Sequence, residues 1–277
     1  MILPKSILLG IACLGAVMLV LALLVRLMEN SITFHPTGNL ELNPADYGLD
    51  YREIRLTPGE RGVTLHGWYF APADGKAPVL LVCHGNAGNI SHRLEWLVPF
   101  LRRGWGALLF DYRGYGLSTG KPTERGLYKD AETAYEFLAG TEGLEPRRIV
   151  IFGRSLGGAV GTWLAARKQC GRLVLEGTFT SGAAISRRIF GFIPLHLATR
   201  YRWNTARELE AVKAPVLILH GTSDSVVPFE LGQDLVEIKP AGRKLEFVRV
   251  DGGDHLNLHL ILGTGYYDTV ERFVLSE

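Results

Sequence analysis

A serine between two glycines is the feature of this sequence best suited to chemistry. Gly153 and Gly157 flank Ser155 in a G-x-S-x-G pattern, which lies between an apolar run at 149–152 and a segment with helical spacing at 156–168. This order is typical of a strained strand-to-helix turn that presents a serine nucleophile. A side chain on either glycine would collide with the adjacent strand or helix, and the helix N-terminus favours developing negative charge. The pattern therefore predicts Ser155 as a nucleophile.

A serine hydroxyl is a weak nucleophile without a base, and in this order of elements an acid and then a histidine follow the serine. Eight histidines are present, and only His255 and His259 follow a late apolar run. His255 lies on the loop directly after that run and is the expected base, whereas His259 lies one helical turn further on. Asp224 follows the preceding run, at 216–219. We expect Asp224 to accept a hydrogen bond from His255 and to hold its tautomer.

Other acids and a metal site are alternatives to this arrangement. Asp251 and Asp254 share the loop of the histidine and are expected not to reach behind its ring. Glu176 follows another apolar run and stays a candidate for the acid. The two late histidines are spaced i, i+4, but no glutamate of a zinc-protease motif lies between them. We therefore expect no metal, and no cofactor, because a serine mechanism needs none.

An oxyanion hole needs two backbone N–H donors aimed at the tetrahedral intermediate. One is expected from Leu156, the residue after the nucleophile, and the other from Asn86, on the glycine-rich loop after the first parallel run. His84 begins that loop, and we expect its ring to hydrogen-bond the loop rather than a substrate. The residues expected to brace the neighbouring loop are Asp111, Arg113 and Tyr115.

Short apolar runs separated by amphipathic segments have to position these residues. The pattern predicts a strand pair at 49–56 and 64–70, followed by alternating strands and helices. This indicates an α/β fold with a mostly parallel sheet of about eight strands, the first two antiparallel, and helices on both faces. In such sheets function lies at the carboxyl ends of the strands. The other expected strands are 78–83, 107–110, 149–152, 173–175, 216–219 and 246–250, and the expected helices are 91–102, 124–139, 156–168, 229–238 and 257–275.

Composition excludes several other classes of protein. The chain has 277 residues, of which 47% are hydrophobic and 21% charged, so it is not a disordered chain. Three cysteines exclude a disulfide-stapled scaffold. A net charge of +2 provides no basic field for binding nucleic acid.

The first residues predict a membrane anchor. Twenty uncharged residues, 6–25, would form a helix about 30 Å long, the thickness of the hydrocarbon core of a bilayer. Twelve of them are Ile, Leu or Val, which favours insertion by about 4–7 kcal/mol. A cleaved signal peptide is the alternative, but Arg26-Leu27-Met28-Glu29 offers no small-x-small cleavage site. The expected domains are an anchor at 1–29 and a catalytic domain at 30–277.

The flanks of this span set its expected orientation in the membrane. The amino terminus and Lys5 lie on one side, and Arg26 is the only positive residue before Arg52 on the other. By the positive-inside rule, we expect a cytoplasmic N-terminus and an extracytoplasmic catalytic domain. Ala12 and Ala16 are small and four apart, a spacing that would let two anchors pack as a homodimer but that is common by chance.

Taken together, six sequence motifs indicate a protein family more specifically than any one of them does alone. They are HGNAGN at 84–89, DYRGYGLSTGKPTERGLY at 111–128, GRSLGGA at 153–159, EGTFTS at 176–181, HGTSD at 220–224 and GGDH at 252–255. In this combination the chain resembles the α/β-hydrolases, and among them the bud-emergence type of N-terminally anchored serine hydrolases. The resemblance covers residues 30–277 and implies the triad Ser155, Asp224 and His255, acting on esters or thioesters. One departure is that Leu256 follows the histidine where the family usually has asparagine.

An insert at about 178–205 stands where this fold usually carries a short cap. Its stretch 189–197 is markedly apolar and is flanked by arginines and aromatic residues. Such a pattern suits either an interface with lipid headgroups or a cover that lines an acyl pocket. In both cases the pocket should be apolar, which favours an acyl ester, lipid-like and possibly from the membrane, over a charged substrate.

Three other functions stay open at this point. A thioesterase or protein deacylase would use the same triad on a different leaving group. A serine peptidase of this fold usually needs a large extra domain, and none is predicted here. An anchored binding module without activity would be expected to have lost a triad member, whereas all three are present.

Overall fold

Six apolar runs form neighbouring parallel strands in the computed structural model, which describes residues 4–191, 198–238 and 244–276. Together with β2 (Arg52–Leu56) and β3 (Leu65–Phe70) they make one eight-stranded sheet, in the order β10-β9-β8-β7-β4-β6-β3-β2. β3 is antiparallel to both β2 and β6, and the other neighbours are parallel, which confirms the predicted fold class. The parallel strands are β4 (Val79–Cys83), β6 (Gly106–Phe110), β7 (Ile149–Arg154), β8 (Arg172–Glu176), β9 (Val216–Gly221) and β10 (Leu245–Val250).

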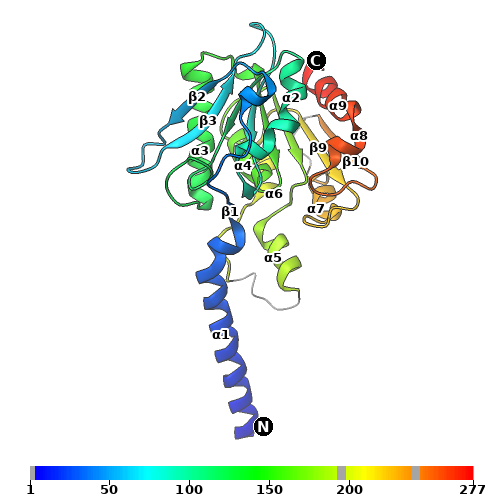
Figure 1. Ribbon diagram of the computed structural model, residues 1–277. Coiled ribbons are helices and arrows are strands. Elements are labelled where there is room, and N and C mark those ends of the chain that lie inside the picture. The colour runs from blue at the N-terminus through cyan, green and yellow to red at the C-terminus, as the bar shows by residue number, and fades with distance from the viewer. Residues whose placement is uncertain (1–3, 192–197, 239–243, 277) are drawn as a thin grey trace.

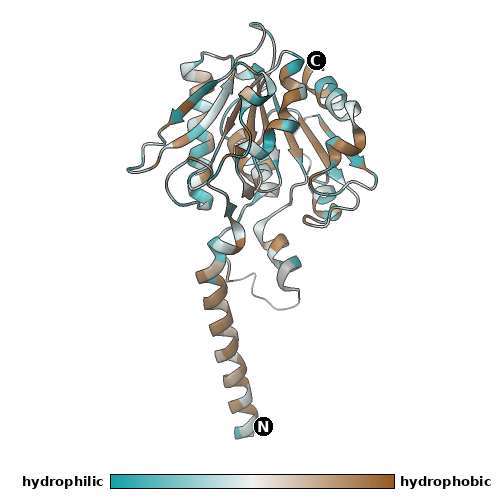
Figure 2. Cartoon of the chain, viewed as in Figure 1, coloured by the Kyte–Doolittle hydropathy of each residue, from teal (hydrophilic) through white to brown (hydrophobic). Residues whose placement is uncertain are grey.

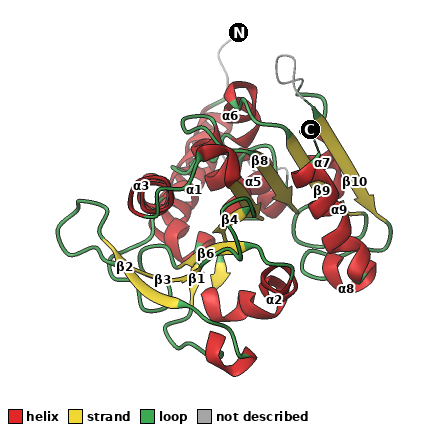
Figure 3. Ribbon diagram, turned by 90° about the horizontal axis from the view of Figure 1, so that it is seen from above, coloured by secondary structure: helices red, strands yellow, loops and turns green. Residues whose placement is uncertain are grey.

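Helices cover both faces of this sheet, as Figure 3 shows from above. Side chains alternate along each strand, so that Leu81 and Ile151 face one core while Leu80 and Phe152 face the other. Burial on both faces explains why these strands are continuously apolar. One face is covered by α3 (Glu124–Glu136), α4 (Leu156–Ala165) and α6 (Thr205–Ala211), and the other by α2 (Leu94–Arg102) and α9 (Thr264–Leu275).

The remaining elements are short. The predicted continuous helix over 257–275 is wrong, because Gly263, with a φ of 54°, separates α8 from α9. A two-residue parallel bridge, β1 with β5, ties the end of the N-terminal helix to the loop after β4. These elements are β1 (His35–Pro36), η1 (Pro44–Tyr47), β5 (Ala87–Gly88), η2 (Ile90–Arg93), η3 (Phe137–Thr141), η4 (Pro146–Arg148), α5 (Gly182–Phe190), α7 (Phe229–Asp234) and α8 (Leu258–Leu262).

The N-terminal helix α1 (Lys5–Thr33) projects from the domain as a separate rod (Figure 1). It is apolar along most of its length (Figure 2), and by length and composition it could span a membrane. The predicted span, 6–25, lies inside it, but the helix continues to Thr33. Val25 and Glu29 are buried. The last turns of α1 are thus part of the folded domain, and the predicted boundary after residue 29 falls inside a helix.

Candidate active site

Ser155 lies on the sharp turn between β7 and α4, at the carboxyl edge of the sheet. Its φ of 53° is in the left-handed region, which a serine adopts only where the surrounding structure imposes it. A Cβ on Gly153 would lie 2.4 Å from the carbonyl oxygen of Gly157, and a Cβ on Gly157 would lie 1.9 Å from that of Cys83. Both positions of the turn therefore require glycine.

His255 and Asp224 meet near this turn. His255 Nδ1 lies 2.8 Å from Asp224 Oδ2, and Oδ1 of the same carboxylate accepts from the backbone N–H groups of Val226 and Val227, at 3.0 and 2.7 Å. Burial by itself would raise the pKa of Asp224, but hydrogen bonds from His220 and His255 outweigh it and hold the pKa well below its usual value. An ionised Asp224 favours the tautomer of His255 with the proton on Nδ1. In that tautomer Nε2 can accept a proton.

Ser155 and His255 line the same cavity. In the described part of the chain no hydrogen bond joins the serine hydroxyl to the imidazole ring. Contacts between a nucleophile and its base often form only when substrate is bound. The ends of β7, β9 and β10 thus bring a strained serine, a carboxylate and an oriented imidazole to one edge of the sheet.

The acids on the histidine's own loop do not contact its ring. Asp254 accepts hydrogen bonds from the backbone N–H and hydroxyl of Ser225, and from the backbone N–H of His255. Asp251 pairs with Arg249 at the surface, with 2.6 Å between Oδ1 and Nε. Both carboxylates therefore support loops rather than the imidazole.

Glu176 is buried, and its carboxylate contacts residues other than the histidine. Its Oε1 lies 2.6 Å from Arg154 Nη2, and its Oε2 accepts a hydrogen bond from the hydroxyl of Tyr266. His259 lies on α8, as its spacing predicts. Among the described residues no three His, Cys, Asp or Glu side chains come together in a group that could hold a metal ion.

The two predicted oxyanion donors border one cavity with the serine. Leu156 is the first residue of α4, so its N–H has no acceptor within the helix. The peptides on both sides of Asn86 are held: its own carbonyl accepts from the His35 N–H and the Tyr115 hydroxyl, both at 2.9 Å, and the carbonyl of Gly85, in the same peptide as the Asn86 N–H, lies 2.8 Å from His84 Nδ1. The Asn86 side chain donates to the carbonyl of Thr33 at 3.1 Å. Both N–H groups are thus held on rigid segments beside the nucleophile.

Buried polar residues brace the loops around Asn86. His84 is fully buried, and its Nε2 lies 3.7 Å from Asp111 Oδ1. Burial lowers the pKa of His84 to about 3, so its ring is neutral. Asp111 accepts from the backbone N–H of Ile90 at 3.0 Å, and Arg113 pairs with Asp130 at 2.8 Å. These contacts hold the loops after β4 and β6 in place. Because His84 is fully buried among them, its ring does not reach a substrate.

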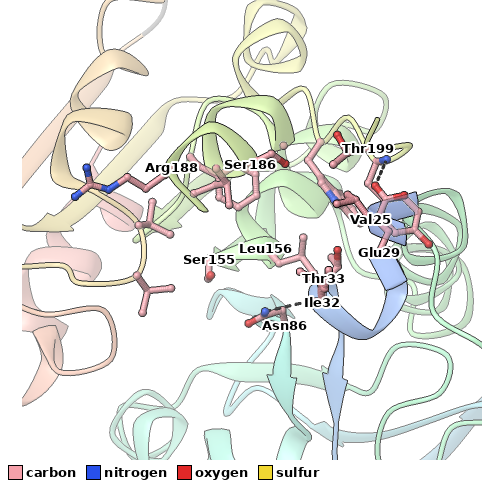
Figure 4. Close-up of a pocket in the computed structure, with 17 residues that line it drawn as sticks. Val25, Glu29, Ile32, Thr33, Asn86, Ser155, Leu156, Ser186, Arg188 and Thr199 are labelled. Carbon is pink, nitrogen blue, oxygen red and sulfur yellow. Dashed lines mark hydrogen bonds between the residues drawn. The ribbon is translucent and has the colours of Figure 1, made fainter. Parts of the chain in front are cut away.

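An apolar cavity of about 270 Å³ lies beside the serine. Figure 4 shows that its walls come from the strand ends, from the cap and from the end of α1. Of the apolar stretch at 189–197, residues 192–197 lie outside the described residues. The cap contributes Ile185, Ser186, Arg188, Tyr201 and Trp203, and α1 contributes Val25, Glu29, Ile32 and Thr33.

Glu29 fastens α1 to the cap. Its side chain is 4% exposed, and it accepts from the backbone N–H groups of Arg200 and Tyr201, at 2.7 and 2.9 Å, and from Arg200 Nε at 3.0 Å. Asn30 Nδ2 donates to the carbonyl of Pro122 at 3.2 Å. Sequence reasoning missed this contact because it ended the anchor at Glu29. An acid within one helical turn of the end of an apolar span was the available signal.

Comparison with known proteins fits this geometry. The family model described as alpha/beta hydrolase fold matches residues 78–194. The alpha/beta hydrolase domain-containing protein WAV2 of Arabidopsis thaliana is 32% identical over 94% of this chain and 91% of its own length. The chain belongs to the α/β-hydrolase family.

Two further comparisons concern a relative of known sequence and a solved structure. The hydrolase is 34% identical to protein bem46 of Schizosaccharomyces pombe, over 79% of this chain and 77% of that protein, which supports the predicted bud-emergence type. The solved structure of an esterase from Pyrococcus furiosus superposes with a TM-score of 0.71 at 20% identity, over 87% of this chain and 97% of that one. At that identity the likeness shows the fold alone.

Proposed function

We propose that this hydrolase is a membrane-anchored serine esterase that cleaves acyl esters. The observation that carries the proposal is the contact of His255 Nδ1 with Asp224 Oδ2 in the same site as the strained Ser155. A base whose tautomer is fixed by an ionised acid, beside a serine at a helix N-terminus, is the arrangement that activates serine for acyl transfer.

The reaction follows from these three side chains. The Ser155 hydroxyl attacks the carbonyl carbon of the ester and gives its proton to His255 Nε2, while the N–H groups of Asn86 and Leu156 stabilise the oxyanion. The bond to the alcohol then breaks, and the alcohol leaves with the proton from His255. Water attacks the acyl-enzyme by the same route, and the carboxylic acid and the free serine are released.

The apolar cavity supports a lipid-like acyl group. Its walls include Val25 and Ile32 of α1, the helix proposed to cross the membrane. A cavity built on the end of such a helix lies close to the bilayer surface, where an acyl chain can enter without crossing water. With the N-terminus in the cytoplasm, as the positive-inside rule predicts, this site would face the outer leaflet.

Covalent labelling tests the proposed nucleophile. A fluorophosphonate probe should label the full-length protein in detergent, and peptide mapping should place the adduct on Ser155, because only an activated serine reacts quickly. Ser276→Ala, a change at the C-terminal end, should label as the wild type does. Labelling that persists in Ser155→Ala, or that is absent from the folded wild type, would refute this mechanism.

A further inference from the structure

A second cavity meets the apolar one at the serine. The two share Ser155, Asn86 and Val226 and otherwise have different walls. The second cavity, of about 320 Å³, lies against the loop after β4 and against His255. An ester bound at Ser155 can therefore extend into two separate spaces.

His255 decides which part of an ester occupies each space. During cleavage it must return its proton to the departing alcohol oxygen. Its ring lines the second cavity and not the first. The acyl chain therefore belongs in the apolar cavity beside α1, and the alcohol belongs in the second cavity.

Arg93 is a cation of the second cavity that forms no ion pair within the described residues. It ends η2, its Nη2 donates to the carbonyl of Ala87, and its Nε is buried without a hydrogen-bond partner. Asp111 acts on it only at longer range. Burial, and then the nearby Arg154, lower the pKa of Arg93 to about 10, so it stays charged at neutral pH. A partly buried cation of this kind is stabilised when a ligand supplies the anion.

The other charged groups of this cavity already have partners. Arg154 Nη2 lies 2.6 Å from Glu176 Oε1. His92 Nδ1 accepts from the backbone N–H of Asn89 at 3.2 Å, and its Nε2 lies 3.3 Å from Glu41 Oε1. The cavity wall thus carries two guanidinium groups against one carboxylate, and Arg93 is the group left for a ligand.

We propose that Arg93 forms a subsite for a phosphate group on the alcohol side of the ester. The substrates are then acyl esters of a phosphate-bearing alcohol, and the bilayer position of the acyl cavity favours phospholipids with one acyl chain. The planar fork of a guanidinium matches phosphate oxygens. The phosphate leaves with the alcohol, and no bond to phosphorus breaks. This inference rests on the proposed function. It also means that the expectation of an uncharged substrate applies only to the acyl part of the ester.

Two lipids that differ only in the phosphate provide the test. We expect the full-length enzyme to hydrolyse palmitoyl lysophosphatidic acid in mixed micelles with a kcat/KM at least about 10-fold above that for monopalmitoylglycerol, from one charge-assisted hydrogen bond. Palmitoyl coenzyme A distinguishes the source, because it carries its phosphates on a soluble leaving group. Since it is a thioester, its rate is compared with that of palmitoyl-N-acetylcysteamine, a thioester without phosphate. Preference for either phosphate-bearing substrate over its phosphate-free counterpart supports the subsite and names the source, whereas rates equal to or lower than those of both counterparts overturn it.

Variants test whether Arg93 causes the preference for the phosphate-bearing lipid. Arg93→Gln should lower the ratio of the two kcat/KM values by about 10- to 100-fold, and Arg93→Lys, which keeps the charge, should lower it less. Arg147→Gln, which removes an exposed arginine paired with Glu145, should keep the wild-type ratio. If Arg93→Gln slows both substrates equally, or folds and keeps the ratio, Arg93 is structural and the inference is wrong.

A binding measurement separates this inference from the proposed function. Ser155→Ala should bind palmitoyl lysophosphatidic acid more tightly than monopalmitoylglycerol, and adding Arg93→Gln should remove the difference. If wild type hydrolyses neither lipid but this binding pattern holds, the esterase proposal fails and the phosphate subsite stands. If hydrolysis depends on Ser155 but ignores the phosphate, the subsite fails and the esterase stands.

Discussion

Asp224 is held by more contacts than a single ion pair. It receives two backbone N–H groups on one oxygen and the His255 ring on the other, and its side chain is 1% exposed. Because hydrogen bonds outweigh burial and lower its pKa, it is ionised throughout the range in which enzymes of this type work. Its carboxylate can therefore stabilise a protonated His255 during the reaction.

Removing this charge should cost most of the activity. Asp224→Asn should lower kcat for a p-nitrophenyl ester by about 10³- to 10⁴-fold, because the wrong tautomer of His255 is then favoured. Asp251→Asn, on the same histidine loop, should stay within about twofold, since Asp251 contacts Arg249 instead. Equal losses in the two variants would contradict the assignment of the acid.

The same carboxylate predicts a pH dependence of stability. Its pKa is lower in the folded state, so its stabilisation is fully present above the ordinary aspartate pKa, about 4, and is lost as pH falls through the lower folded value. The difference in Tm between wild type and Asp224→Asn should therefore be constant from about pH 7 to 5 and shrink below about pH 4. A difference that grows on acidification would contradict the direction of this shift.

Single residues at strand ends could be predicted from the sequence, and residues on cavity walls could not. Ser155, Asp224 and His255 each lie on the turn or loop that follows an apolar run, so the strand pattern places them at one edge. Arg93 and Ile32 line cavities through tertiary packing of η2 and α1, and no local pattern marks such contacts. The structure supplied these two residues.

At the scale of elements, we propose two roles for α1 along its length. Its first turns are exposed and apolar, as a membrane span requires, while its last turns pack against the cap and the loop after β4. The hydrophobic run predicted the first role from its length alone. The second role depends on the contact of the buried Glu29 with Arg200 of the cap, which lies 171 residues further along the chain.

Weakening this attachment should alter the acyl cavity. Glu29→Gln places an amide against two backbone N–H donors and a guanidinium, which should loosen the α1 wall. We expect the ratio of kcat/KM for long-chain to short-chain p-nitrophenyl esters to fall by about 5- to 10-fold. Glu145→Gln, at an exposed site far along the chain, is the control. An unchanged ratio in a folded Glu29→Gln protein would show that α1 is only a tether.

For the whole molecule, the sheet determines which residues come together at the site. The strand order and direction followed from the alternation of apolar runs and helices, and the structure agrees with it. The position of α1 beside the carboxyl edge of the sheet, visible in Figure 1, could not be predicted, because it depends on packing between distant segments. This arrangement places the serine and its apolar cavity at the end of the molecule from which α1 projects.

The most direct measurement of the central claim is hydrolysis of p-nitrophenyl esters, from short to long acyl chains, by the full-length protein in detergent with Ser155→Ala as the blank. The structure predicts turnover that depends on Ser155 and that has its optimum at chains long enough to fill the cavity beside α1. If wild type and Ser155→Ala are equally inactive across the series, the molecule is not an ester hydrolase of the kind proposed here.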